Sequence, residues 1–260
     1  MYVDGAVPCC GCCLRRPPLE DCTIQSKGIH CLVVDASPHA DVVTRRDATT
    51  STAGRQTASV TKTRFTVSDL TGADPYKLAT GLIVPRPIGW IGTVAANGVP
   101  NLAPYSFFNC MSGVPPTFVF APGRSVRRDT LDNVREVGEF TINIVTDEVV
   151  EAMNATAASH EAGVDEFVEA GLTAVPSQSI RPPMVGECKA NIECVVVDIV
   201  DIGDPEHGNG LVIGEAVEFH VDEALLDGTR VDQAALRAVG RHVGNTYSRA
   251  TDLFAILRPD

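Results

Sequence analysis

The sequence predicts a mainly β protein with a few helices, an α+β chain built around a β-barrel. From Phe65 onward, short apolar segments alternate with turn residues, a pattern that is typical of a β-rich domain. Few helical segments interrupt these strands, and strands and helices do not alternate as they do in a doubly wound sheet. The sequence also lacks the glycine-rich dinucleotide fingerprint, the Walker loop and the nucleophile elbow. These observations favour a barrel over a nucleotide-binding α/β fold.

The strands are expected where apolar runs lie between turn signals. Residues 88–94 and 102–108 flank Asn97-Gly98, and an Asn-Gly pair between such runs indicates a hairpin because both residues tolerate a positive φ. We therefore expect an antiparallel hairpin at this point. Further apolar segments predict strands at 117–121, 139–145, 190–202 and 211–221.

Three helices are expected between the strands. Asp129 can cap a helix that ends at Gly138, and Asp147 can cap a second helix over residues 148–157. Asp232 is expected to open a third, short helix. The apolar face of the first helix comprises Leu131, Val134 and Val137.

The bulk composition argues against two kinds of partner. Lys and Arg total 21 against 33 Asp and Glu, which gives a formal net charge of −12 that repels a nucleic-acid backbone. No apolar run approaches the length that crosses a bilayer. With no secretory signal at the N-terminus, we expect a soluble, cytoplasmic protein without nucleic-acid or membrane partners.

Residues 1–64 lack a sustained apolar period, so we expect a disordered N-terminal extension followed by one domain over residues 65–260. Six of the nine cysteines lie in this extension and could in principle hold a thiophilic metal together with His30. Their spacing does not match a known zinc finger, so an unstructured tail or a mis-assigned start codon is favoured and no metal site is predicted. These cysteines are Cys9, Cys10, Cys12, Cys13, Cys22 and Cys31.

One segment combines an aromatic strand end with a basic loop. Residues 101–109 end a strand with backbone amides and carbonyls beside flat aromatic rings. In the loop that follows, Arg124, Arg127 and Arg128 lie within five residues, ahead of the helix expected at Asp129. Guanidinium groups and helix N-terminal amides both bind phosphate. From the residues alone, the segment is either an anion-binding loop or a solvated loop beside ordinary core aromatics.

Five separated motifs in this chain resemble the flavin reductase-like, FMN-binding split β-barrel family in order and spacing. The resemblance runs from about Phe65 to the C-terminus, and the N-terminal extension has no counterpart. The motifs are Pro85-Arg-Pro-Ile-Gly-Trp90, Asn101-Leu-Ala-Pro-Tyr-Ser-Phe-Phe-Asn109, Pro115-Pro116, Arg128-Asp-Thr130 and Glu139-Phe-Thr-Ile-Asn143.

This resemblance implies an FMN site at the edge of a homodimer interface. The residues it places against the isoalloxazine are Ser106, Phe107, Phe108 and Asn109, with Ser112 nearby. The residues it places at the phosphate are Ser125, Arg128 and Thr130. A later segment is expected to close over the flavin with Arg241, Gly244 and Tyr247. Further candidates, for each of which a purely structural role is left open, are Arg86, Asn154, Thr156 and His242.

The function implied by the resemblance is that of an FMN-dependent oxidoreductase. In such an enzyme the flavin accepts a hydride from NAD(P)H or another donor and passes electrons to an acceptor, for example a partner monooxygenase. The alternatives are a non-catalytic FMN-binding or redox-sensing flavoprotein and the pyridoxamine phosphate oxidase type of split barrel. No catalytic residue is assigned. Asn209 lies where the small flavin reductases carry a histidine, so we expect tight FMN binding but slow reduction by free NADH or NADPH.

Overall fold

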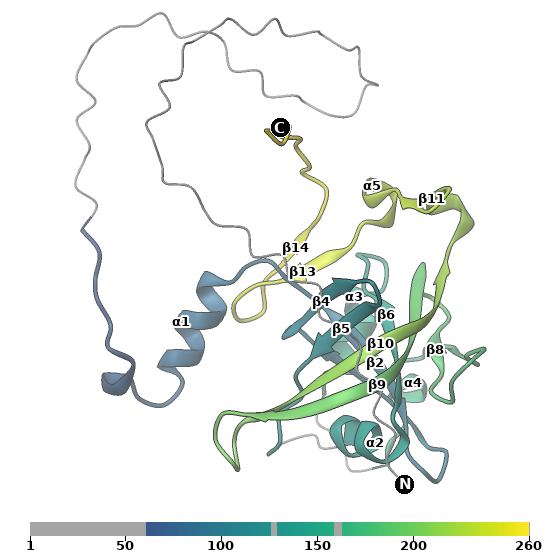
Figure 1. Cartoon of the computed structure of the whole chain (residues 1–260), viewed down its shortest axis with the longest axis horizontal. Helices are drawn as coiled ribbons and strands as arrows, with labels where there is room; N and C mark the ends of the chain where they lie inside the picture. Colours follow the sequence, from purple (N-terminus) through teal and green to yellow (C-terminus); the bar gives the residue numbers. More distant parts are fainter. Residues whose placement is uncertain (1–60, 126–128, 159–162, 260) are drawn as a thin grey trace, which may run out of the picture. The chain divides into compact units, whose positions relative to one another are not determined.

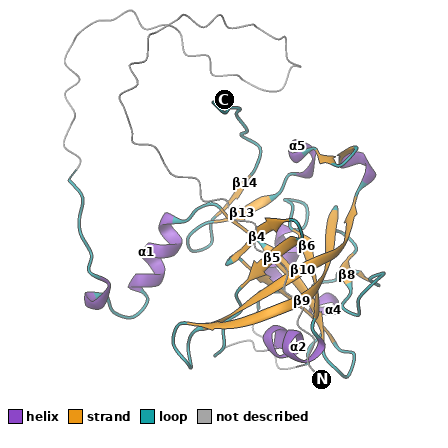
Figure 2. Ribbon diagram, viewed as in Figure 1, coloured by secondary structure: helices purple, strands orange, loops and turns teal. Residues whose placement is uncertain are grey.

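A computed structural model of the chain describes residues 61–125, 129–158 and 163–259. A seven-stranded antiparallel sheet dominates this part of the chain (Figures 1 and 2), in the order β3-β2-β6-β9-β10-β5-β4. The mainly β architecture expected from the sequence is confirmed. The strands of the sheet are β2 (Gly89–Val94), β3 (Pro100–Tyr105), β4 (Phe108–Gly113), β5 (Pro116–Phe120), β6 (Glu139–Ile144), β9 (Ala190–Ile202) and β10 (Asn209–Val221).

The two edge strands of the sheet, β3 and β4, follow each other directly in the chain and are joined only by Ser106 and Phe107. This link brings the two edges of the sheet together at one corner, which we call the β3–β4 corner. The backbone N–H of Ala121 donates to the Phe107 carbonyl at 3.0 Å and ties the corner to the end of β5. Gly89 on β2 lies against the Phe108 ring, where a Cβ atom would come within 2.6 Å of it. A side chain at position 89 would therefore force the Phe108 ring to shift.

Two hydrophobic cores hold the helices against the sheet. Alternate residues of a strand point to opposite faces, so β2 contributes Trp90 to one core and Ile91 to the other. The first core also contains Met153 and Phe167 from two helices, and the second contains Leu131 from a third helix. The helices are α1 (Asp74–Leu82), α2 (Asp129–Val137), α3 (Val150–Ala155), α4 (Glu166–Glu169) and α5 (Gln233–Leu236), with short 3₁₀ turns η1 (Val67–Asp69) and η2 (Glu223–Leu225).

Three small sheets accompany the large one. The sheet that matters for the site joins β1 (Arg86–Pro87), β13 (Val239–Arg241) and β14 (Tyr247–Arg249), so residues near position 86 lie beside residues near position 241. The others pair β7 (Ala174–Val175) with β8 (Met184–Val185), and β11 (Leu226–Asp227) with β12 (Arg230–Val231). Among the described helices, none is long and apolar enough to cross a membrane.

Most expected elements are confirmed, two need correction, and two helices were not expected. The hairpin over Asn97-Gly98 is present, with Gly98 at φ 89°. The strand expected over 102–108 ends at Tyr105, because the chain turns at the β3–β4 corner. The helix expected at 148–157 begins only at Val150, because the Asp147 carboxylate binds arginines instead of capping it. Helices α1 and α4 were not expected, since the α1 sequence DPYKLATGL carries no clear apolar stripe and α4 is only four residues long.

Candidate functional site

A hollow of about 530 Å³ lies at the β3–β4 corner, and residues from β1 and from four further segments of the chain line it. Helix α1 forms one wall, the β3–β4 corner a second and α3 a third. The segment from β13 to β14 forms the fourth wall. We call it the basic hollow, because it is lined by four basic residues: Lys77, Arg86, Arg241 and His242. No Asp or Glu is among the described residues that line it.

Arg86 is the structural hub of the basic hollow. It is only 5% exposed, and its guanidinium donates hydrogen bonds to neutral oxygens from three elements. Nη1 donates to the carbonyls of Thr80 at 2.6 Å and Ile83 at 3.0 Å, which fixes the end of α1. Nη2 donates to the His242 carbonyl at 3.0 Å, and Nε donates to Ser106 Oγ at 3.3 Å. One buried side chain thus holds α1, the β3–β4 corner and the loop after β13 together.

Arg241 is held over the hollow by neutral groups as well. Its guanidinium carbon lies 4.5 Å from the centre of the Tyr247 ring, in a cation–π arrangement. Nη1 contacts the Tyr247 hydroxyl, and Nη2 contacts the carbonyl of Gly244. The Tyr247 hydroxyl donates to Asn154 Oδ1 at 3.1 Å, which links this wall to α3. The segment expected to close over the flavin therefore does form one side of a hollow.

His242 lines the basic hollow, and one of its ring nitrogens has no partner in the described part of the chain. Its backbone N–H donates to the Thr246 carbonyl at 2.9 Å, and its carbonyl accepts from Arg86. Its Nε2 atom is buried and has no hydrogen-bond partner among the described residues. Buried polar atoms without a partner are rare and costly, so this nitrogen is an exception within the described part of the chain.

A second hollow of similar size, about 530 Å³, lies beside α2 and the turn between β9 and β10. We call it the mixed-charge hollow, because arginines and carboxylates line it together. Arg124 Nη1 lies 3.1 Å from one oxygen of Asp201, and Arg135 Nη2 lies 3.0 Å from the other. Arg124 also contacts the carbonyl of Asp204. Ser125 lines this hollow, but within one chain it does not line the basic hollow.

The structure brings only some of the predicted site residues together. Ser106, Arg241 and Tyr247 line the basic hollow, whereas Ser125 lines the mixed-charge hollow and Arg128 lies outside the described residues. Thr130 is 2% exposed, and its hydroxyl accepts a hydrogen bond from Asn101 Nδ2 at 2.9 Å.

The remaining predicted residues lie at the corner and along β4. Phe107 is 43% exposed, and its ring packs edge-on against the Tyr76 ring with the two ring centres 6.3 Å apart. The Phe108 ring stacks on Phe118. Two polar side chains of β4 are engaged locally, since Asn109 Oδ1 accepts from the Cys110 backbone and Ser112 Oγ accepts from the Val114 backbone.

Several functional candidates were missed or only partly seen in the sequence. Lys77 and Tyr76 line the basic hollow from α1, and no motif pointed to them. Thr156, a secondary candidate, is buried and binds Trp90 Nε1 at 2.9 Å, which gives it a structural role in the core. Asn209 donates from Nδ2 to the Ala121 carbonyl at 2.9 Å, so its amide is already engaged within the chain.

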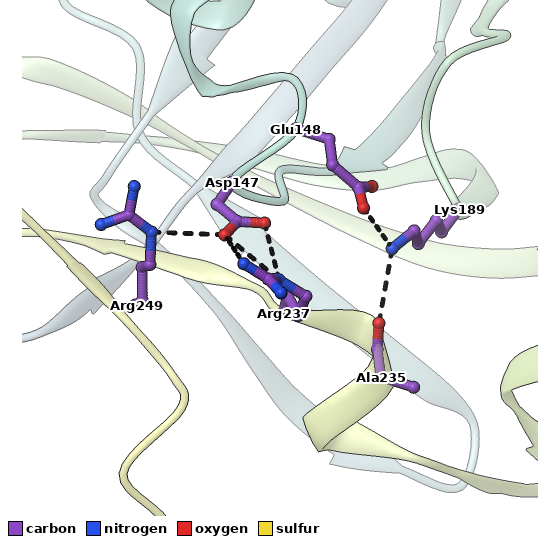
Figure 3. A network of polar contacts seen from close by, with 6 residues as sticks. All are labelled: Asp147, Glu148, Lys189, Ala235, Arg237 and Arg249. Atoms are coloured by element: carbon purple, nitrogen blue, oxygen red, sulfur yellow. Dashed lines mark hydrogen bonds and ion pairs between the residues drawn. The ribbon is translucent and has the colours of Figure 1, made fainter.

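An ion-pair cluster holds the β13–β14 wall in place (Figure 3). The Asp147 carboxylate accepts from Arg237 Nε at 3.0 Å and from Arg249 Nε at 3.2 Å. Lys189 Nζ donates to Glu148 at 2.9 Å beside it. The hydrogen bond from Arg237 holds the pKa of Asp147 below its ordinary value of 3.8. Because Arg237 precedes β13 and Arg249 ends the antiparallel β14, Asp147 clamps the open end of this wall, where the two strands begin and end side by side.

A group of three titratable residues lies on β9 and β10. Glu193, Glu218 and His220 have ligand atoms within 4.8 Å of one another. Glu193 is fully buried, and this burial acts to raise its pKa. Hydrogen bonds from the backbone N–H groups of Gln178 and Ser179 and from His220 outweigh the burial, so the pKa lies below the ordinary value of 4.5. With protein donors on both its oxygens, Glu193 serves to anchor the chain around residue 178.

Comparison with known proteins identifies the family. The flavin reductase like domain matches residues 81–236. Among solved structures, nitrilotriacetate monooxygenase component B from Bacillus cereus is 34% identical, with a TM-score of 0.73 over 75% of this chain and 99% of its own. The 2-nitrobenzoate 2-nitroreductase NbaA from Pseudomonas fluorescens is 32% identical, with a TM-score of 0.70 over 76% of this chain and 96% of its own. A split barrel domain structure from Shewanella frigidimarina, 24% identical, shares the fold with a TM-score of 0.67 over 76% of this chain and all of its own. The chain therefore belongs to the flavin reductase-like family and has its split-barrel fold.

Proposed function

We propose that this chain is an FMN-dependent oxidoreductase that takes a hydride from NAD(P)H and passes electrons to a further acceptor. The observation that carries the proposal is the basic hollow at the β3–β4 corner, where Ser106, Arg241 and Tyr247 converge. A volume of about 530 Å³ is within the range of small-molecule and cofactor sites. Family membership supports a flavin as the bound group, and FMN is our choice over FAD.

The residues present fit such a cofactor. Flat rings on Tyr76 and Tyr247 and the guanidinium of Arg241 suit a planar heterocycle that carries carbonyl acceptors. When bound, FMN supplies the hydride-accepting chemistry. The chain's own part is to hold the ring against the β3–β4 corner, with Ser106 and Arg241 as polar contacts, and to limit water access with α1 and the β13–β14 wall.

We further propose that the flavin lies between two protomers of a homodimer. The proposed phosphate ligands Ser125 and Arg128 belong to the loop ahead of α2, whereas the proposed ring contacts lie at the β3–β4 corner. A dimer lets the loop of one protomer complete the hollow of its partner. Such a pairing would also cover apolar side chains that the described part of one chain leaves exposed on β4, β9 and β10: Met111, Val197, Val217 and Phe219.

The assignment as a flavin-dependent oxidoreductase also leads to a proposed domain and a proposed electron acceptor. We propose residues 65–260 as the flavin-binding domain and a monooxygenase as one candidate acceptor. The name of the Bacillus cereus relative, component B of a monooxygenase, supports that acceptor. The second candidate function is a non-catalytic FMN-binding or redox-sensing protein. One observation favours it: the Asn209 amide is engaged with Ala121 and offers a nicotinamide neither aromatic surface nor positive charge.

Anaerobic reduction distinguishes the two functions. The FMN-loaded protein is mixed with NADH or NADPH, and the visible absorption of the flavin is followed over time. Bleaching in proportion to the added nicotinamide is the result expected for the oxidoreductase, with Asn209→His faster than the wild-type chain. If dithionite bleaches the flavin and neither nicotinamide does, the oxidoreductase assignment fails and the storage or sensing function remains.

A further inference from the structure

Three side chains of the metal-binding kind lie together on two neighbouring strands, apart from both hollows described above. They are Glu193 on β9 and Glu218 and His220 on β10, and none of them lines the basic hollow or the mixed-charge hollow. In the antiparallel pairing of β9 with β10 (Figure 1), Glu218 is the register partner of Glu193, and His220 follows two residues later on the same face. The backbone pairing therefore places two carboxylates and an imidazole on one face of the sheet.

This arrangement sets two negative charges opposite each other. Like charges on directly opposite residues destabilise a pair of strands, and Glu193 is fully buried, so solvent screens its charge little. Lys189, a nearby cation, is paired with Glu148 instead. Among the described residues, His220 is the one basic group within ion-pair distance of Glu193 or Glu218. A bound cation would balance the second carboxylate.

The distances within the cluster are close to those around a single metal ion. His220 Nε2 lies 2.7 Å from Glu193 Oε1 and 3.7 Å from Glu218 Oε2, and the three ligand atoms all lie within 4.8 Å of one another. Ligand atoms on one ion, at bond lengths of about 2.0–2.2 Å, lie about 3.0–3.6 Å apart, so shifts of about 1 Å bring these three into place. The side chains of His220 and Glu218 are 31% and 40% exposed and therefore have room to shift.

Glu193 is already oriented as a metal ligand is. The backbone N–H groups of Gln178 and Ser179 donate to its Oε1 and Oε2, each at 2.8 Å, and hydrogen bonds of this kind orient metal-binding carboxylates. Oε1 also faces His220 Nε2, and in the tautomer that carries its proton on Nδ1 both atoms direct a lone pair at the same point. Glu218 supplies the third ligand, since its Oε2 has no hydrogen-bond partner among the described residues.

An open hollow of about 380 Å³ gives an ion access to the cluster, because His220 lines it. Three protein ligands leave coordination positions for water from this side. Two carboxylates and one imidazole suit divalent ions such as Mn²⁺ and Zn²⁺, and not the soft ions that select thiolates alone.

We propose that Glu193, Glu218 and His220 form a binding site for one divalent transition-metal ion. The ion joins β9 to β10 and, through Glu193, holds the segment around residue 178, and water completes its coordination. The site does not depend on the proposed flavin function, because none of its ligands lines the hollow assigned to the flavin.

Titration of the full-length chain with Mn²⁺, followed by electron paramagnetic resonance, tests the proposal. Mn²⁺ is the probe because its preference for oxygen ligands keeps it from the cysteines of the N-terminal extension. The sharp signal of free Mn²⁺ should fall until one ion is bound per chain. Glu218→Gln should weaken binding by about 100-fold or more, since loss of even an outer-shell partner commonly costs about 10- to 100-fold.

Glu187→Gln is the matched control. It removes one negative charge from the same hollow and keeps the side-chain oxygen that accepts from the Thr173 backbone N–H, so Mn²⁺ binding should not change. Thermal unfolding gives a second measurement. Mn²⁺ should raise the unfolding midpoint of the wild-type chain and of this control, and not those of Glu218→Gln and His220→Gln, because an ion that binds only the folded state stabilises it.

Three results would overturn the site. If the free Mn²⁺ signal persists with the chain in excess, or if wild-type and Glu218→Gln chains bind Mn²⁺ equally, then His220 is the whole counter-charge of the two carboxylates. If Glu187→Gln weakens binding as much as Glu218→Gln does, the ion lies elsewhere in the open hollow. If Mn²⁺ binds only after FMN is added, the ion is held by the flavin phosphate and not by this cluster.

Discussion

The basic hollow and the mixed-charge hollow are similar in size, and each is lined by two arginines. The two pairs of arginines differ in their partners. In the mixed-charge hollow, Arg124 and Arg135 share the carboxylate of Asp201. In the basic hollow, the partners of Arg86 and Arg241 among the described residues are hydroxyl, carbonyl and ring groups. Paired arginines hold two segments of the chain together, whereas arginines without a counter-charge leave their field available to a ligand.

This contrast shows that a count of arginines does not locate an anion site. The loop after β5 is richer in arginine in the sequence, yet the described arginine of that loop, Arg124, is already paired. The basic hollow gathers its arginines from positions far apart in the chain, and none of the described residues that line it carries a carboxylate. Whether a carboxylate neutralises an arginine depends on tertiary structure. This pairing decides which arginines remain available to bind an anion.

The largest expected difference between the hollows concerns stability. Arg86→Met should lower the free energy of unfolding by about 3 kcal/mol, because it removes the buried hydrogen bond to the Thr80 carbonyl and the part-buried ones to Ile83 and His242. Arg135→Met should cost about 1 kcal/mol or less, because Arg135 and Asp201 are each about half exposed. Chemical denaturation of the two variants measures both values. Equal costs would show that the Arg86 contacts do not hold the corner together.

The next effect concerns the flavin phosphate. Arg128→Ala and Ser125→Ala should weaken FMN binding, with Arg128→Ala costing about tenfold or more, because a charge-assisted hydrogen bond to the phosphate is lost. Riboflavin lacks the phosphate and should bind both variants as it binds the wild-type chain. Fluorescence titration with the two flavins gives the comparison. If Arg241→Gln instead weakens the binding of FMN and leaves that of riboflavin unchanged, the phosphate binds in the basic hollow and not at Ser125 and Arg128.

A smaller, pH-dependent effect is expected from the clamp on the β13–β14 wall. The pKa of Asp147 is lower in the folded chain than its ordinary value of 3.8, so the ionised form is favoured by folding. Its stabilising contribution is therefore complete above about pH 4 and is lost as the pH falls through the lowered folded pKa. Asp147→Asn should remove this contribution near neutral pH and flatten the acid side of the stability profile. Unfolding curves measured for both chains between neutral and acidic pH check the difference, and identical slopes would contradict it.

The sequence predicted those features that depend on neighbouring residues. The Asn97-Gly98 hairpin and the long strands β9 and β10 follow from local apolar patterns and turn residues, and the structure confirms them. Asp232 caps α5 through the N–H groups of Ala234 and Ala235, as a local pattern can indicate. The order and spacing of separated motifs predicted the family and its split-barrel fold, and the comparisons confirm both.

Features that depend on distant residues could not be predicted in this way. Asp147 has the local pattern of a helix cap, but Arg237, 90 positions later, takes its carboxylate. Arg86 reaches the His242 carbonyl across 156 positions, so its role as a hub has no local signal. The basic wall from α1 was missed because a short helix without an apolar stripe gives no periodic pattern. Tertiary contacts, which no local pattern records, assemble this site.

The measurement that tests the account most directly is the identity of the flavin that the purified chain retains. The protein is incubated with equal amounts of FMN and FAD, separated from free flavin and denatured, and the released flavin is identified by chromatography and mass. The account predicts FMN in proportion to the chain, with its visible spectrum altered while it is bound. A folded chain that releases no flavin after this treatment would contradict the proposed function.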